Sequence, residues 1–253
     1  MRRLQRVSTV VFDCDSTLSA VEGIDTLARR HAEQIEQLTE AAMRGEVPLE
    51  QVYGRRLELV RPDRQQLAAL GEQYIAELVP DAAAVVQALR AERIVVRIMS
   101  GGLRPAVLVL GRALGLEPND VAAVDLRFDA DGRYRGYDEA SPLTRTGGKR
   151  ELLGIWRREL PGPLMMVGDG ATDLEARDVA DVFVAYAGVA ARSAVIAAAD
   201  VVVRSHSLAP VFALALAGGR PRLPEHQPLL VRGLELLEDE YHAFLPKPKH
   251  NHA

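Results

Sequence analysis

The sequence has a single cysteine, Cys14, so no disulfide can form within the chain, as is usual in a reducing compartment. Its apolar runs are far shorter than the ~20 residues that a membrane span requires. The formal net charge is only −4, and no basic stripe indicates a nucleic-acid partner. The start, Met1-Arg2-Arg3, does not lead into a secretory signal. We therefore expect a cytoplasmic monomer or homodimer that binds neither membranes nor nucleic acids.

The chain has 253 residues, of which 48% are apolar, and this is enough for one large domain with a small insert. Short β-branched runs alternate with helix-like segments, which predicts a parallel sheet covered by helices. Buried strands are expected at Val7–Phe12, Ile94–Met99, Leu164–Val167, Val182–Val184 and Val201–Val203.

Between the first two strands lies a long stretch, Glu22 to Pro80, without a convincing strand. A βαβ crossover needs only about a dozen or more residues, so we expect a small helical domain inserted here. The expected division is an α/β core of residues 1–18 and 81–220, a helical cap of residues 19–80, and a C-terminal extension of residues 221–253.

Two further segments interrupt the alternating pattern. Ala130-Asp131-Gly132 separates two alternating segments within Asp125–Asp138, and Asp-Gly at such a place predicts a hairpin. The C-terminal extension is expected to form a helix over Leu229–Tyr241, followed by a flexible tail.

Two carboxylates, Asp13 and Asp15, follow the first strand and would project to the same side if the chain stays extended. Burying both without a partner is costly, so the pair favours a cation or a positioned ligand. An ordinary acidic turn would have the same sequence. A calcium-binding EF-hand loop is excluded, because its sixth and twelfth positions would be Leu18 and Ile24 instead of Gly and Glu.

Glycine-rich turns follow at two later places. Ser100-Gly101-Gly102 offers a hydroxyl and backbone N–H groups that can approach a phosphate, although a plain strand-to-helix turn would look the same. Thr146-Gly147-Gly148-Lys149 lacks the first glycine and the final Ser/Thr of a nucleotide P-loop. Lys149 is therefore either a solvated lysine at a helix start or a single phosphate-pairing charge.

The segment Gly168-Asp169-Gly170-Ala171-Thr172-Asp173 begins like a dinucleotide fingerprint, but Asp173 replaces the third glycine. Two acids in a glycine-rich turn instead favour a hard cation such as Mg²⁺, which prefers oxygen ligands. Asp13, Ser100 and Asp169 all fall at the carboxyl ends of expected parallel strands, where open α/β sheets bind ligands. Together they indicate a Mg²⁺-phosphate site with an acidic nucleophile.

These segments resemble, in order, the four motifs of the haloacid-dehalogenase superfamily: Asp13-x-Asp15-x-Thr17, Ser100, Lys149 and Gly168-Asp169-Gly170-x-x-Asp173. Within it, the chain resembles the branch that hydrolyses phosphoserine, over roughly residues 10–204. The resemblance implies a Rossmann-like parallel-sheet core with an inserted helical cap. It also implies a Mg²⁺-dependent phosphomonoester hydrolase that acts through an aspartyl phosphate.

The same resemblance implies roles for individual residues. Asp13 is the nucleophile and Asp15 the general acid and base. Mg²⁺ is bound by Asp13, the main-chain carbonyl of Asp15 and Asp169, and Asp173 supports these ligands. Substrate and phosphate are bound by Glu22, Met43, Gly45, Arg56, Ser100, Gly101, Gly102, Lys149 and Thr172.

Arg56 suits the carboxylate of phosphoserine, and Glu22 suits its ammonium group. Taken alone, both residues would be ordinary solvated side chains. Leu49 stands where the family often has an aromatic residue, which weakens the expected apolar wall over the substrate. Transfer of the phosphoryl group to an alcohol such as homoserine, hydrolysis of a different phosphomonoester, and a non-catalytic binding role remain as alternatives.

Overall fold

The centre of the molecule is a six-stranded sheet in the order β3-β2-β1-β6-β7-β8, with every neighbouring pair parallel. It comes from a computed structural model that describes residues 5–28, 33–35, 38 and 49–244. The strands are β1 (Thr9–Phe12), β2 (Val95–Leu103), β3 (Val121–Val124), β6 (Leu164–Gly168), β7 (Val182–Tyr186) and β8 (Val201–Val203). All five predicted strands are present, and β3 is an additional edge strand.

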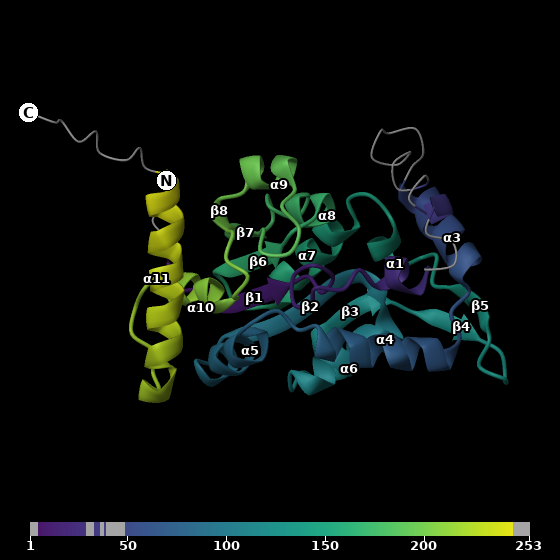
Figure 1. Ribbon diagram of the computed structural model, residues 1–253, viewed down its shortest axis with the longest axis horizontal. Helices are drawn as coiled ribbons and strands as arrows, with labels where there is room; N and C mark the ends of the chain where they lie inside the picture. Colours follow the sequence, from purple (N-terminus) through teal and green to yellow (C-terminus); the bar gives the residue numbers. More distant parts are fainter. Residues whose placement is uncertain (1–4, 29–32, 36–37, 39–48, 245–253) are drawn as a thin grey trace, which may run out of the picture.

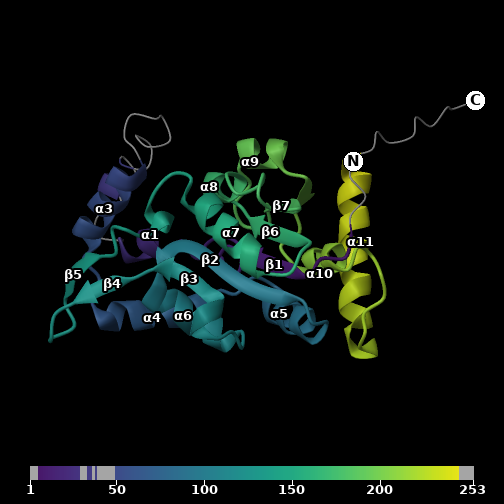
Figure 2. The same cartoon turned by 180° about the vertical axis from the view of Figure 1, so that it is seen from behind.

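Helices cover both faces of the sheet (Figures 1 and 2). One layer contains α4 (Arg64–Ala76), α5 (Ala82–Ala91), α6 (Arg104–Ala113) and α10 (Ala209–Ala215), and the other contains α7 (Gly148–Glu159), α8 (Ala171–Leu174) and α9 (Ser193–Ala198). Because side chains alternate along a strand, Val10 and Phe12 of β1 enter the first core and Val11 enters the second. This burial on both faces explains why the strands are almost wholly apolar.

The chain changes direction across the sheet between β1 and β6. From β1 it proceeds outward through β2 to β3, and it then returns to β6 and proceeds the other way to β8. Such a reversal opens a crevice beyond the carboxyl ends of the two central strands, where open α/β sheets bind ligands. The segments after β1 and β6 therefore meet at this crevice.

The segment between β1 and β2 is helical where the structure describes it, with α1 (Gly23–Leu27), α3 (Leu49–Val60) and α4. Arg61-Pro62-Asp63 separates α3 from α4, and the Asp63 carboxylate caps α4 by accepting from the Gln66 N–H at 2.8 Å. Helix α4 packs closely along α6. Gly71 allows this approach, since a Cβ there would lie 2.6 Å from Cβ of Val109.

The predicted hairpin is present as β4 (Leu126–Phe128) and β5 (Tyr134–Tyr137), which pair antiparallel. Gly132 in its turn has φ +80°, a conformation that glycine adopts without strain. The hairpin reaches the helical segment, where the rings of Tyr53 and Tyr137 have centroids 5.4 Å apart. The hairpin and α3 thus lie together at one end of the molecule (Figure 1).

At the opposite end, α11 (Gln227–Phe244) packs against α10 and contains the predicted helix over residues 229–241. The buried carboxylate of Glu92 ties the preceding segment to the core by accepting from the Arg222 N–H at 2.7 Å and from Arg6 at 2.6 Å. The predicted tail after residue 244 lies outside the described residues. Within the described ranges, no helix combines the length and apolar character needed to cross a bilayer.

Candidate active site

Three buried carboxylates meet at the crevice between β1 and β6. Asp13 follows β1, Asp169 follows β6, and the two strands are adjacent with Phe12 opposite Val167. Asp173 comes from the first turn of α8. Oxygen atoms of the three carboxylates all lie within 4.8 Å of one another. Gly168 makes room for this arrangement, because a Cβ there would lie 2.2 Å from Cγ of Asp173.

Lys149 supplies a buried positive charge to this cluster. Its Nζ lies 2.9 Å from Oδ1 of Asp13 and 2.6 Å from Oδ1 of Asp173. The preceding glycines explain how the lysine reaches this place: Gly147 has φ +75°, and a Cβ on Gly148 would collide with the carbonyl oxygen of Pro142. Lys149 is therefore a buried ion-pair partner and not a solvated lysine at a helix start.

The ionisation of the cluster reflects its burial and charge. Burial, followed by the nearby Asp173 carboxylate, raises the pKa of Asp13 to about 7, against the opposing effect of Lys149. Burial and then Glu22 raise the pKa of Asp15, also to about 7. Burial by itself lowers the pKa of Lys149, but Asp13 and Asp173 raise it on balance, so this ammonium stays charged.

The cluster fits a hard divalent cation. Three buried carboxylates face the ammonium of Lys149 and the partly exposed guanidinium of Arg192, which pairs with Asp169. One negative charge remains in excess, and a bound cation would compensate it. Mg²⁺ takes oxygen ligands and is usually held by one or two carboxylates together with phosphate oxygens. Thr17 Oγ1 orients one of these carboxylates by donating to Oδ1 of Asp169 at 3.1 Å. The side chain of Asp15 is not part of the cluster.

Ser100, Gly101 and Gly102 lie beside this cluster within an irregular end of β2. The sequence placed them in a turn after the strand, but β2 continues to Leu103 because Leu103 still pairs with Val124 of β3. Ser100 Oγ accepts from the Gly102 N–H at 2.9 Å. A Cβ on Gly102 would lie only 2.9 Å from that oxygen, so a larger residue here would displace the Ser100 hydroxyl.

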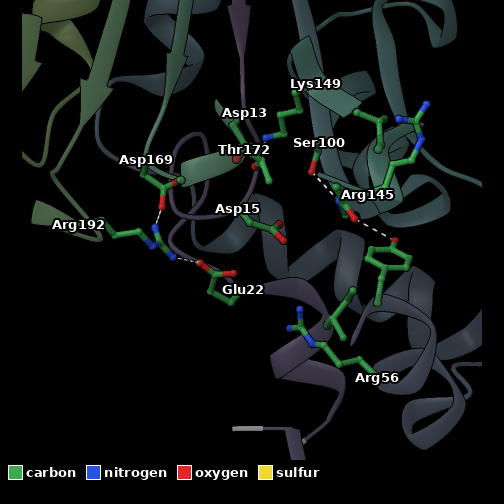
Figure 3. Close-up of a pocket in the computed structure, with 16 residues that line it drawn as sticks. Asp13, Asp15, Glu22, Arg56, Ser100, Arg145, Lys149, Asp169, Thr172 and Arg192 are labelled. Carbon is green, nitrogen blue, oxygen red and sulfur yellow. Dashed lines mark hydrogen bonds and ion pairs between the residues drawn. The ribbon is translucent and has the colours of Figure 1, made fainter. Parts of the chain in front are cut away.

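Glu22 and Arg56 face the acidic cluster from the helical segment (Figure 3). Glu22 accepts from Ser16 Oγ at 2.7 Å and from Arg192 at 3.3 Å. Arg56 forms an ion pair with Asp25. Its Nε is buried and has no hydrogen-bond partner among the described residues, so the guanidinium retains an unused donor.

A single cavity gathers these groups. Its volume is about 190 Å³, smaller than the roughly 300–1,000 Å³ of pockets for drug-sized ligands, so it suits a small substrate. Its lining includes most of the residues predicted from the sequence: Asp13, Asp15, Glu22, Arg56, Ser100, Gly101, Gly102, Lys149, Asp169 and Thr172. Met43, Gly45 and the side chain of Leu49 lie outside the described residues.

Sequence reasoning missed three polar residues of the lining, Tyr53, Arg145 and Arg192. Arg192 follows β7 and forms ion pairs with Asp169 and Glu22, which links the acidic cluster to the helical segment. Tyr53 donates from its hydroxyl to the carbonyl oxygen of Gly101 at 2.9 Å. Position after a parallel strand was a usable signal for Arg192, whereas nothing in the sequence marked Tyr53.

Comparison with known proteins agrees with this geometry. A family model described as haloacid dehalogenase-like hydrolase matches residues 7–181. A chloroplastic phosphoserine phosphatase of Arabidopsis thaliana is 38% identical over 199 residues, covering 77% of this chain and 68% of the relative. The phosphoserine phosphatase of Bos taurus is 35% identical over 182 residues, covering 71% of this chain and 81% of the relative.

A solved structure of substrate-bound phosphoserine phosphatase superposes with a TM-score of 0.66 at 26% identity, covering 79% of this chain and 94% of the other. The doubly wound sheet and the carboxylates at its switch point place the chain among α/β enzymes with an acidic active site. The chain belongs to the haloacid dehalogenase-like hydrolase family.

Proposed function

We propose that the protein is a Mg²⁺-dependent phosphatase that hydrolyses O-phosphoserine to serine and phosphate through an aspartyl phosphate. The observation that carries the proposal is one small cavity with two chemically different ends. Asp13 and Lys149 lie at one end, and Glu22 and Arg56 lie at the other. A zwitterionic amino acid esterified to phosphate has charges that match both ends.

The chemistry needs two displacements at phosphorus. A carboxylate oxygen of Asp13 attacks the phosphorus, the ester P–O bond breaks, and the serine oxygen leaves with a proton from Asp15. Asp15, now ionised, removes a proton from a water that attacks the phosphorus of the aspartyl phosphate. The bond to Asp13 then breaks, phosphate leaves, and both carboxyl groups return to their initial states.

The other residues of the cavity hold the phosphoryl group and the metal in this scheme. Lys149, Ser100 and the N–H group of Gly101 hold the phosphoryl oxygens. Gly102 orients Ser100 by donating its N–H to Oγ, and Thr172 lines the same end. Asp13, Asp169 and the carbonyl of Asp15 would hold Mg²⁺, which supplies neutralisation of the phosphoryl charge. Asp173 keeps Lys149 in place through its 2.6 Å contact.

Within residues 19–80, the part before α4 serves as the cap that closes over the substrate and excludes bulk water, while α4 packs along α6 beside the sheet. Met43 and Gly45 belong to this assignment as further substrate contacts. Arg56 forks onto the substrate carboxylate through its unused Nε and a terminal nitrogen, and Glu22 accepts from the ammonium group.

The test asks whether a variant loses activity on phosphoserine while it keeps activity on a phosphate ester without the amino-acid group. Arg56→Lys keeps the charge but cannot form two parallel hydrogen bonds, and Glu22→Gln removes the anion. A lost charge-assisted hydrogen bond costs about 1.5–3 kcal/mol, which corresponds to roughly 10- to 150-fold in kcat/KM. That loss is expected with phosphoserine and not with p-nitrophenyl phosphate, which has neither a carboxylate nor an ammonium group.

Lys149→Ala is the matched control, because it removes a phosphoryl contact and should impair both substrates alike. Adding homoserine and measuring phosphohomoserine separates transfer to an alcohol from hydrolysis. Unchanged phosphoserine hydrolysis in both Arg56→Lys and Glu22→Gln would reject the substrate while leaving the phosphatase assignment in place.

A further inference from the structure

Tyr74 is a buried tyrosine whose hydroxyl group contacts the active site. It lies on α4, its side chain is among the largest fully buried ones, and its ring belongs to the main core cluster. The hydroxyl donates a hydrogen bond to Oδ1 of Asp15 at 2.5 Å. A tyrosine hydroxyl fixes the position of its hydrogen-bond partner only if the ring cannot move. Close packing in the core holds this ring in place.

The carboxylate of Asp15 is held on both oxygens. Oδ1 accepts from Tyr74, and Oδ2 accepts from the N–H of Gly23 at the longer distance of 3.3 Å. These contacts turn the group away from Asp13, which lies two residues earlier and pairs with Lys149.

Two glycines leave the space that the Tyr74 hydroxyl occupies. A Cβ on Gly23 would lie 2.2 Å from the Tyr74 oxygen, and a Cβ on Gly102 would lie 3.5 Å from it. The hydroxyl therefore fits between the start of α1 and the end of β2, next to the phosphate-binding segment. Three parts of the chain converge on one buried oxygen atom.

We propose that Tyr74 is a positioning residue that holds Asp15 in line with the leaving-group oxygen of the substrate. A general acid must lie within hydrogen-bond reach of the atom it protonates, so a loose carboxylate transfers its proton poorly. Oδ1 accepts the shorter hydrogen bond, from Tyr74 at 2.5 Å, whereas the Gly23 N–H lies 3.3 Å from Oδ2. Oδ2 is therefore the oxygen left to carry the proton to the leaving alkoxide. This assignment rests on the proposed function.

The test uses leaving groups of different basicity. Tyr74→Phe keeps the ring and removes the hydroxyl. With ethyl phosphate, whose alkoxide needs a proton and which has no amino-acid group for Arg56 and Glu22 to bind, kcat/KM should fall about 10- to 100-fold, part of the 10²–10⁴ that general acid catalysis contributes. With p-nitrophenyl phosphate, whose phenolate leaves without a proton, kcat/KM should stay near that of the wild type.

Tyr186→Phe is the matched control, since Tyr186 is also buried and its hydroxyl donates to the carbonyl of His206 at 2.6 Å, outside the cavity lining. It should leave the ratio of the two substrates unchanged. Gly23→Ala displaces the Tyr74 hydroxyl without removing it and should reproduce the selective loss, which provides a second route if Tyr74→Phe does not fold. In an Asp15→Asn background, Tyr74→Phe should have no further effect.

An equal loss on both substrates, or no loss on either, would overturn the role of Tyr74. So would a full additional loss in the Asp15→Asn background. If the wild type does not hydrolyse phosphoserine but cleaves another alkyl phosphate, the proposed substrate fails. The same comparison of alkyl phosphate with p-nitrophenyl phosphate still decides the role of Tyr74.

Discussion

The ammonium nitrogen of Lys149 lies 2.9 Å from Oδ1 of Asp13, and both side chains are buried. The lysine reaches from the start of α7, and the aspartate follows β1. The pair places a permanent positive charge beside the proposed nucleophile. It also keeps that carboxylate more acidic than burial alone would leave it.

Replacing Lys149 by Met is expected to remove this charge while keeping an unbranched side chain that is one atom shorter. Because Lys149 lowers the pKa of Asp13, its loss should raise that pKa further and move the acid limb of the kcat/KM profile to higher pH. Breaking a buried pair costs about 3–5 kcal/mol, so stability should also fall. The pH profile with p-nitrophenyl phosphate and urea unfolding measure the two effects, and an unmoved acid limb would contradict the first.

Magnesium is expected to stabilise the protein more strongly as the pH rises. Burial raises the pKa values of Asp13 and Asp15 from 3.8 to about 7, so the metal-free folded state keeps protons that the unfolded chain has lost. The contribution of these two carboxyl groups to stability is therefore fully present below about pH 4 and is lost as the pH rises through about 7. A cation that binds the ionised carboxylate of Asp13 competes with the proton on that group and reverses part of the decline.

Thermal unfolding with and without Mg²⁺ measures this effect between about pH 5.5 and 8, with chelator in the metal-free samples and NaCl matching ionic strength. The affinity should change about tenfold per pH unit for each proton displaced, and only below the folded pKa. Activity should disappear in chelator and return with Mg²⁺. An equal increase in Tm at every pH would show that the carboxylate of Asp13 does not bind the metal.

Gly233→Ala is expected to loosen α11 from α10. A Cβ at this position would lie 2.3 Å from the carbonyl oxygen of Ala209, so one helix must shift. Overpacking of this kind costs about 1–3 kcal/mol. The kcat of the folded enzyme should not change, because α11 lies away from the cavity (Figure 1).

Gly154→Ala is the control for this change, since Gly154 lies within α7 and a Cβ there would meet no atom within 4 Å. It should leave stability unchanged or raise it by up to about 1 kcal/mol. Urea unfolding compares the two variants. Equal stabilities would mean that α11 does not depend on this close contact.

Local pattern was sufficient for the strands and for the motifs that follow them. Five of the six parallel strands were predicted because strands buried on both faces are short apolar runs, visible without any partner. The sequence predicted that Asp13, Ser100 and Asp169 lie at one edge of the sheet, because the carboxyl ends of neighbouring parallel strands meet there. The hairpin around Gly132 followed equally from local turn chemistry.

Pairing between distant segments decided what the local pattern could not. The sequence ended the second strand before Ser100, since glycines weaken a strand, but pairing with β3 extends it to Leu103. Strand β3 itself, Val121–Val124, is a four-residue edge strand that exists by virtue of that partner.

The same limit applies to the active site. The sequence alone determined which carboxylates, glycines and lysine follow the central strands, because their spacing along the chain is a local property. Only the tertiary structure brought Tyr53, Tyr74 and Arg192 to them, through contacts at Gly101, Asp15 and Asp169. An ordinary helix or loop position carries no sign of the group that it will contact, because packing between elements far apart in sequence decides that contact.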